Sequence, residues 1–152
     1  MEFDERVARA RGWLIAAKPL TIVEQADRLL GLSLAGAPKT ALASAAKQLL
    51  AEQRPDGGWA QVRTLESDAY GTAAAMVALV KTGSLTASSQ PWQRAKAFLL
   101  NTQFPDGSWY VASRAVKLQP YFESGFPFGH DQWISNSATG YAVAALAAGM
   151  GH

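Results

Sequence analysis

The amino-acid sequence predicts an all-α fold of about six helices arranged as three helical hairpins. Apolar residues recur at helical spacing in several segments, and one loop pattern occurs twice. The chain reads LLAEQRPDGGW at residues 49–59 and LLNTQFPDGSW at residues 99–109, a constant offset of 50. Similarity at a fixed period indicates a supersecondary unit that is used more than once. No long alternation of apolar and polar residues predicts a sheet, and SWYVASRAV at residues 108–116 is the one candidate for a short strand.

One type of helix is predicted at residues 4–17, 38–52 and 91–102. In the second of these segments, apolar residues follow the spacing of a buried helix face at Leu42, Ala45, Ala46, Leu49 and Leu50. The same template shifted by 50 residues fits 91–102, and both segments have a proline near their start, where it is tolerated. The opening RARGWL at residues 9–14 is similar to RAKAFL at 94–99, which predicts the first helix of this type.

A second type of helix is rich in small residues and ends in glycine, a common helix stop. EQADRLLGLSLAG at residues 24–36 aligns with YGTAAAMVALVKTG at 70–83, and SNSATGYAVAALAAG at 135–149 is a third segment of this kind. The two types alternate along the chain. We therefore expect three hairpins within one domain of residues 1–152.

The repeated loop is predicted to be a structural joint between helices. A glutamine amide can both donate and accept hydrogen bonds at helix ends. Pro-Asp-Gly favours a turn, and a tryptophan can cover the joint while its indole N–H finds an acceptor. The repeated positions are Gln53, Gly57 and Trp59 in the first copy, and Gln103, Gly107 and Trp109 in the second.

RAKAFLLNTQFPDGSW at residues 94–109 and KQLLAEQRPDGGW at 47–59 resemble the Gln-Trp (QW) motif of the prenyltransferase and squalene oxidase repeat. Squalene–hopene and oxidosqualene cyclases carry this repeat, and the resemblance runs from about residue 4 to residue 149. It implies an α/α-toroid, in which inner and outer helices alternate around an axis, and an apolar, isoprenoid ligand. Three hairpins are too few to close such a ring. We therefore expect either a piece of a longer chain or a fold completed by self-association with a second copy.

Cyclases of this kind start their reaction by protonating an alkene or epoxide, and the family supplies the acid in an Asp-x-Asp-Asp-Thr-Ala segment. The matching segment here, SDAYGTAAAMVAL at residues 67–79, keeps Asp68 but has Tyr70 and Gly71 at the acid positions. A phenol with a pKa near 10 cannot protonate an isolated alkene. We therefore predict a module that is non-catalytic as it stands, with Asp68 as a helix N-cap. The alternative is an isoprenoid cyclase, or a fragment of one, whose acid motif lies outside this chain.

The segment QPYFESGFPFGHDQWISN at residues 119–136 is predicted to be a long irregular loop. Its aromatic residues either seal one end of the domain or, with nearby polar groups, form a pocket for an apolar ligand or a protein partner. We expect Tyr121, Phe122 and Trp133 in the core, and residues 126–130 at the mouth of the pocket. The candidate pocket comprises Asp68, Tyr70, Tyr121, Glu123, Phe126, Phe128, His130, Asp131 and Trp133.

Composition excludes several other classes of function. The net charge of +2 and the scattered basic residues give no reason to expect nucleic-acid binding. The chain has no cysteine and only two histidines, so we predict no metal site and no cofactor. No apolar run approaches the roughly 18 residues of a transmembrane helix, and the charged start does not resemble a secretion signal. We therefore expect a soluble protein.

Overall fold

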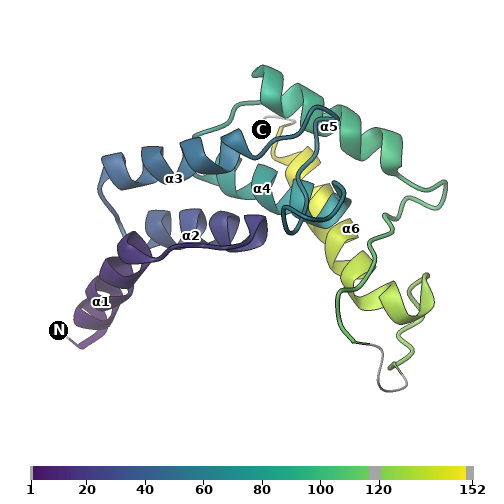
Figure 1. Cartoon of the computed structure of the whole chain (residues 1–152), viewed down its shortest axis with the longest axis horizontal. Helices are drawn as coiled ribbons and strands as arrows, with labels where there is room; N and C mark the ends of the chain where they lie inside the picture. The colour runs from purple at the N-terminus through teal and green to yellow at the C-terminus, as the bar shows by residue number, and fades with distance from the viewer. Residues whose placement is uncertain (1, 117–120, 150–152) are drawn as a thin grey trace.

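Six α-helices follow one another in a computed structural model that describes residues 2–116 and 121–149 (Figure 1). They are α1 (Glu2–Ala16), α2 (Ile22–Leu34), α3 (Lys39–Ala51), α4 (Ala69–Lys81), α5 (Gln90–Thr102) and α6 (Gln132–Ala147). A short 3₁₀ helix, η1 (Gly129–Asp131), precedes α6. The prediction of an all-α fold with six helices is confirmed. Residues 119 and 120 of the predicted aromatic loop lie outside the described residues.

Local sequence signals fix the ends of the second helix. Thr21 forms a capping box with Glu24: the Thr21 hydroxyl accepts a hydrogen bond from the Glu24 N–H at 3.1 Å, and the Glu24 carboxylate accepts one from the Thr21 N–H at 3.0 Å. Backbone hydrogen bonds from Thr21 and Leu20 lower the pKa of Glu24. At the other end, Gly36 adopts a positive φ of 64°, which glycine allows at little cost.

Helix α4 lies at the centre of the packing. It contacts α2 on one side and α6 on the other, while α3 packs against α2 and α5 against α4 (Figure 1). Nearly every residue of α4 from Ala69 to Leu79 is buried, because its many alanines let the neighbouring helices approach closely. Helix α1 packs against α2, and none of its residues is buried.

The expected strand at residues 108–116 is wrong. This segment is irregular, and the backbone N–H groups of residues 109, 111 and 113 donate to side chains of α6 or of Asp131 just before it, instead of to a neighbouring strand. Trp109 N–H bonds to Thr139 Oγ1 at 3.1 Å, and Val111 N–H bonds to Ser135 Oγ at 3.0 Å. These side chains are four residues apart on one helix face, so they satisfy an extended segment without a sheet.

The expected core positions of three aromatic residues are also wrong. Tyr121 is 41%, Phe122 87% and Trp133 53% exposed. Helix α6 turns Ile134 and Ala138 inward, and Trp133 precedes this buried face by one residue. One residue corresponds to about 100° of helix rotation, which points Trp133 away from the core. Among the described residues, no helix combines the length and the apolar character needed to cross a membrane.

Candidate functional site

The two repeated loops make the same tryptophan contact. Trp59 and Trp109 are both fully buried. The indole N–H of Trp59 donates to the carbonyl oxygen of Leu49 at 2.8 Å, and that of Trp109 donates to Leu99 at 2.8 Å. Each indole thus satisfies a carbonyl in the last turn of the preceding helix, where backbone acceptors lack helical partners. We call residues 53–59 the first joint loop and residues 103–109 the second joint loop.

The glutamines close each joint loop on itself. The side-chain amide of Gln53 donates to the carbonyl oxygen of Gly57 at 2.9 Å, and that of Gln103 donates to Gly107 at 2.9 Å. Gly57 and Gly107 have φ values of 92° and 88°, a region that residues with a side chain rarely adopt. The glycine of Pro-Asp-Gly is therefore required by the turn in both loops.

Each joint loop also contacts the helix that follows it. The backbone N–H of Trp59 donates to Thr72 Oγ1 of α4 at 2.9 Å, and that of Trp109 donates to Thr139 Oγ1 of α6 at 3.1 Å. One tryptophan therefore connects the end of one helix with the first or second turn of the next. The role of the two threonines was missed from the sequence because they lie at different distances from their tryptophans.

The first turn of α4 lies directly against the first joint loop. A Cβ atom at Gly71 would lie 2.7 Å from the carbonyl oxygen of Ala60 and 2.8 Å from that of Trp59. Trp59 and Asp68 also form an isolated antiparallel bridge. The backbone of the loop therefore occupies the space that any side chain at position 71 would need.

Asp68 caps α4. One carboxylate oxygen accepts a hydrogen bond from the Gly71 N–H at 2.7 Å, and the other accepts one from the Gln61 amide at 2.9 Å. Arg114 in turn donates to the Gln61 side-chain oxygen at 3.0 Å. Burial raises the pKa of Asp68, and the hydrogen bonds from Gly71 and Gln61 oppose this effect. Burial dominates, so the carboxyl group is a weaker acid than an exposed aspartic acid.

Tyr70 belongs to a different environment from Asp68. Its ring meets that of Tyr141 of α6 edge-on, with 5.7 Å between ring centres. Burial raises the pKa of Tyr70, and Tyr141 and Asp27 add to the effect. Tyr70 therefore stays a neutral phenol on the face shared by α2, α4 and α6.

A hollow of about 380 Å³ lies beside Asp68, between the first turn of α4 and the end of α5. We call it the α4 cavity. Its apolar wall is formed by Leu65, Ala69, Phe98, Val111 and Ala112, and its polar wall by Gln61, Glu66, Ser67, Asp68, Thr102 and Tyr110. This volume is in the range of small-molecule sites, and the lining combines apolar and polar side chains. The Ser67 hydroxyl oxygen is buried and has no hydrogen-bond partner within the described part of the chain.

An aromatic cluster borders the α4 cavity. The ring of Phe128 lies 5.3 Å from those of Phe104 and Tyr110 and 6.4 Å from that of Phe126, measured between ring centres. Phe128 has a φ of 85°, a strained conformation for a bulky residue and one that concentrates at functional sites. The cluster consists of Phe104, Tyr110, Phe126 and Phe128.

Tyr110 links this cluster to a buried carboxylate. Its hydroxyl group donates to Asp131 at 2.9 Å, and this hydrogen bond raises the pKa of Tyr110. Asp131 also accepts from the Ser113 N–H at 3.0 Å. Because Tyr110 lines the α4 cavity, it is the contact between the cavity and the predicted loop residues Phe126, Phe128 and Asp131.

The remaining candidate residues do not line this cavity. The rings of Tyr121 and His130 pair with each other, with 4.3 Å between their centres. Glu123 accepts a hydrogen bond from the Gly125 N–H at 2.7 Å within its own turn. Trp133 is exposed on α6. The structure therefore places Asp68 and Tyr110 in the lining of one cavity and connects Asp131 and Phe128 to Tyr110, with Phe126 beside Phe128. It places Tyr70, Tyr121, Glu123, His130 and Trp133 elsewhere.

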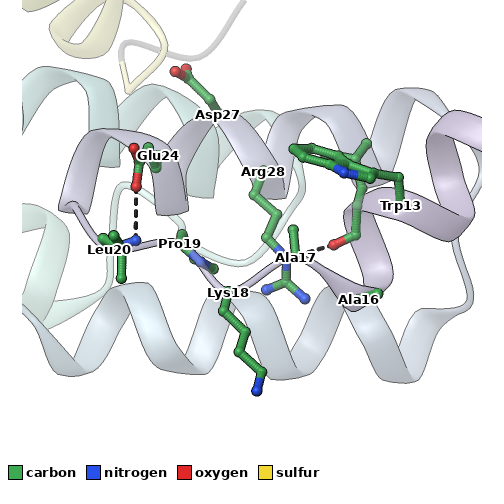
Figure 2. A pocket seen from close by; sticks show the side chains of 10 residues that line it. Trp13, Ala16, Ala17, Lys18, Pro19, Leu20, Glu24, Asp27 and Arg28 are labelled. Carbon is green, nitrogen blue, oxygen red and sulfur yellow. Dashed lines mark hydrogen bonds between the residues drawn. The ribbon is translucent and has the colours of Figure 1, made fainter.

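A larger hollow of about 530 Å³ lies where α1 joins α2 (Figure 2). Figure 2 shows Arg28 extending from α2 towards the end of α1, where it donates to the carbonyl oxygens of Leu14 at 2.7 Å and Ile15 at 3.1 Å. This arginine caps the carboxyl end of α1. Burial, together with the neighbouring Glu24, raises the pKa of Asp27 on the same rim. The hydrogen bonds of Arg28 therefore stabilise the corner between α1 and α2.

No metal centre is visible in residues 2–116 and 121–149, which contain no group of three or more His, Asp or Glu side chains placed to hold an ion. Sequence reasoning missed Gln61, Ser67 and Tyr110. Gln61 is the second residue after the first joint loop and Tyr110 the first residue after the second, so the residues after each repeated tryptophan were the signal that could have found them.

Comparison with known proteins relates part of the chain to an enzyme. No family model matches the chain. A drimenyl diphosphate synthase from Streptomyces showdoensis is 35% identical over 85 residues, which cover 53% of this chain and 16% of the synthase. The chain is related to a terpenoid-cyclase-type enzyme. It matches only that 16% of the synthase, so the activity of the whole enzyme does not transfer with the match.

Proposed function

We propose that this chain is an isoprenoid-cyclase-related module that is non-catalytic as it stands and binds an apolar ligand in the α4 cavity. The observation that carries the proposal is the first turn of α4. There the capping carboxylate of Asp68 is hydrogen-bonded on both oxygens, and Gly71 is packed against the first joint loop.

These features are unsuited to protonating an alkene. That reaction requires a proton donor whose acidity is increased by its surroundings. Burial shifts the pKa of Asp68 in the opposite direction, and Tyr70 is a phenol whose pKa is raised further. Position 71 has no room for a second carboxylate beside them.

The α4 cavity supports the binding part of the proposal. Apolar side chains form one wall, and the exposed Thr102, whose hydroxyl donates to the Phe98 carbonyl oxygen, can accept a hydrogen bond from a polar end group. Tyr110 connects the cavity to an aromatic cluster, whose ring faces suit the double bonds of an isoprenoid chain. The chemistry thus favours a linear isoprenoid with one hydroxyl or similar group.

Product analysis tests the non-catalytic part. The purified chain is incubated with squalene, with its terminal epoxide and with farnesyl diphosphate, and the extracts are analysed by mass spectrometry. We expect only unreacted squalene, and unreacted epoxide and diphosphate with the products of their spontaneous hydrolysis. A cyclic product in any of the three incubations would overturn this part of the proposal.

Calorimetric titration with farnesol tests the binding part. Ala112 lines the cavity and is exposed, so Ala112→Leu adds bulk at the hollow without replacing a buried core residue. Ala115→Leu adds the same atoms at an exposed position outside the lining and serves as the control. We expect the native chain and Ala115→Leu to bind equally and Ala112→Leu to bind about tenfold more weakly, the effect of losing roughly 1.4 kcal/mol. Equal binding by all three, or no binding by the native chain, would contradict the site.

A second candidate function is that of one segment of an isoprenoid cyclase. The observation that favours it is the short share of the synthase that the match covers. An acid motif in a longer parent chain would then supply the proton. A longer chain that forms cyclic products, and loses this activity when its acid motif is replaced by asparagines, would support this candidate.

A further inference from the structure

The first joint loop holds the start of a second helix, α5. The Gln53 amide donates to the carbonyl oxygen of Pro91 at 2.8 Å, and the Arg94 guanidinium donates to the carbonyl oxygen of Arg54. A Cβ atom at Gly57 would lie 2.5 Å from the Arg94 carbonyl oxygen, so the glycine lets the two backbones touch. The first joint loop thus binds the start of a helix through two groups of that helix: a backbone carbonyl oxygen and, three residues later, an arginine side chain.

The second joint loop has the same binding groups, and no described helix start is bound to them. The Gln103 amide bonds to the carbonyl oxygen of its own Gly107, and the nearest atom to a Cβ at Gly107 is the Gln103 amide nitrogen at 3.9 Å. Leu100 is 49% and Phe104 45% exposed, whereas the corresponding residues of the first copy are half-buried. We call Leu100, Gln103, Phe104 and Gly107 the open joint.

Helix α1 carries the features that fit the open joint. The sequence of residues 9–14 matches that of residues 94–99 in α5, which places Arg9 at the position of Arg94 and Arg6 at that of Pro91. In α5 the matching face is buried at Ala95 and Leu99, whereas α1 buries none of its residues. Phe3 is 76% and Trp13 71% exposed. Helix α1 is therefore a helix of the same type that packs on α2 through the half-buried Leu14 and keeps Phe3 and Trp13 exposed.

We propose that the open joint of one copy receives helix α1 of a second copy of this chain. The Arg9 guanidinium of the second copy donates to the Phe104 carbonyl oxygen, and the Gln103 amide donates to the Arg6 carbonyl oxygen. Val143 lies one turn beyond Thr139, on the face of α6 that contacts the second joint loop, and its exposed side chain provides adjoining apolar surface. Helix α1 then stands to α6 as α5 stands to α4.

This contact joins two different surfaces, so association is head-to-tail. Each added copy presents a new open joint, and growth ends only if the rotation between copies closes a ring. A symmetric dimer, by contrast, would use the same patch on both copies and stop at two. The two models therefore predict different assemblies.

Sedimentation velocity of the full chain over a range of concentrations tests the contact. Leu100→Glu places a charge in the open joint, and Trp13→Glu places one on α1. Both side chains are largely exposed in the single copy, so the fold should tolerate the changes. We expect the native chain to form species larger than dimers and each variant to weaken association roughly thirtyfold or more, the effect of losing one interface hot spot. Lys47→Glu on the exposed surface of α3 is the control and should associate like the native chain.

Mixing the two variants gives the sharper result. Leu100→Glu keeps an intact α1, and Trp13→Glu keeps an intact open joint, so an equimolar mixture should form one-to-one dimers and nothing larger. A native chain that stays monomeric at all concentrations would overturn the proposal and leave the open joint for a hairpin of a longer chain. Variants that fail to complement each other would overturn it in favour of a symmetric contact.

Discussion

At the scale of single residues, hydrogen-bond partners distinguish the two copies of the repeated loop. Gln53 and Gln103 occupy the same position and both bond within their own turn. Only Gln53 has a second bond to another helix, and only Gln53 is partly buried. The same glutamine therefore contributes differently to stability in the two loops, because no described helix start bonds to Gln103.

This difference predicts unequal costs for the same substitution. Gln53→Ala should lower the free energy of unfolding by about 1–3 kcal/mol, because it leaves the Pro91 carbonyl oxygen without its donor. Gln103→Ala should cost less than about 1 kcal/mol, since water can replace its single exposed bond. Urea unfolding followed by circular dichroism measures both values. Equal costs would contradict the assigned difference between the loops.

Asp68 predicts a specific pH dependence of stability. Its pKa is raised above the ordinary value of 3.8 in the folded state, mainly by burial. Stability from this group is therefore fully present below pH 3.8 and is lost as the pH rises through the raised pKa. Asp68→Asn keeps a side-chain oxygen for the N-cap but cannot ionise. As the pH rises to neutrality, the variant should therefore become more stable relative to the native chain.

Urea unfolding at several pH values measures the effect. Glu66→Gln, at an exposed carboxylate on the same cavity, changes the net charge equally and is the matched control. A difference between Asp68→Asn and the native chain that is independent of pH would contradict the role assigned to burial.

At the scale of helices and loops, periodicity and glycine stops were sufficient to predict all six helices. These signals did not predict segments whose hydrogen-bond partners come from elsewhere in the chain. Residues 108–116 read as a strand, but Ser135 and Thr139 of α6 supply their acceptors. The exposure of Trp133 depends on which face of α6 meets α4, and a segment rich in small residues does not define that face from sequence.

Two glycines test how the joint loops hold helices. Both Gly57 and Gly107 have a positive φ, so alanine should cost about 1–2 kcal/mol at either position. At Gly57 the added Cβ also meets the Arg94 carbonyl oxygen, which should add about 1–3 kcal/mol through displacement of α5. Thermal unfolding of the two alanine variants measures the difference. If Gly107→Ala lost more stability than Gly57→Ala, the contact of Gly57 with α5 would not contribute as predicted.

At the scale of the whole molecule, the sequence indicated the absence of an acid motif, and it could not locate the cavity. The lining of the α4 cavity comes from α4, α5 and the two loops that follow the repeated tryptophans. No single segment carries that pattern, because it arises only when distant parts of the chain meet. The predicted loop residues reach the cavity through Tyr110, which the sequence did not single out.

The packing of the whole domain predicts that the acid motif cannot be rebuilt by substitution. Tyr70→Asp should fold, because Tyr70 lies on a half-buried face. Gly71→Asp should be strongly destabilised, since its Cβ would overlap the carbonyl groups of residues 59 and 60. Thermal unfolding measures stability, and mass spectrometry after incubation with squalene measures cyclisation. A stable Gly71→Asp variant, or cyclic products from Tyr70→Asp, would contradict this prediction.

The division of the tryptophans between core and surface gives the protein two optical signals. Trp59, Trp92 and Trp109 are buried, whereas Trp13 and Trp133 are exposed on α1 and α6. Emission from the buried group should be blue-shifted and protected from a dissolved quencher such as acrylamide, and emission from the exposed pair should be red-shifted and readily quenched. Unfolding would change the first signal. Covering α1 would change the second while the first stayed constant, so one fluorescence experiment separates loss of the fold from assembly of copies.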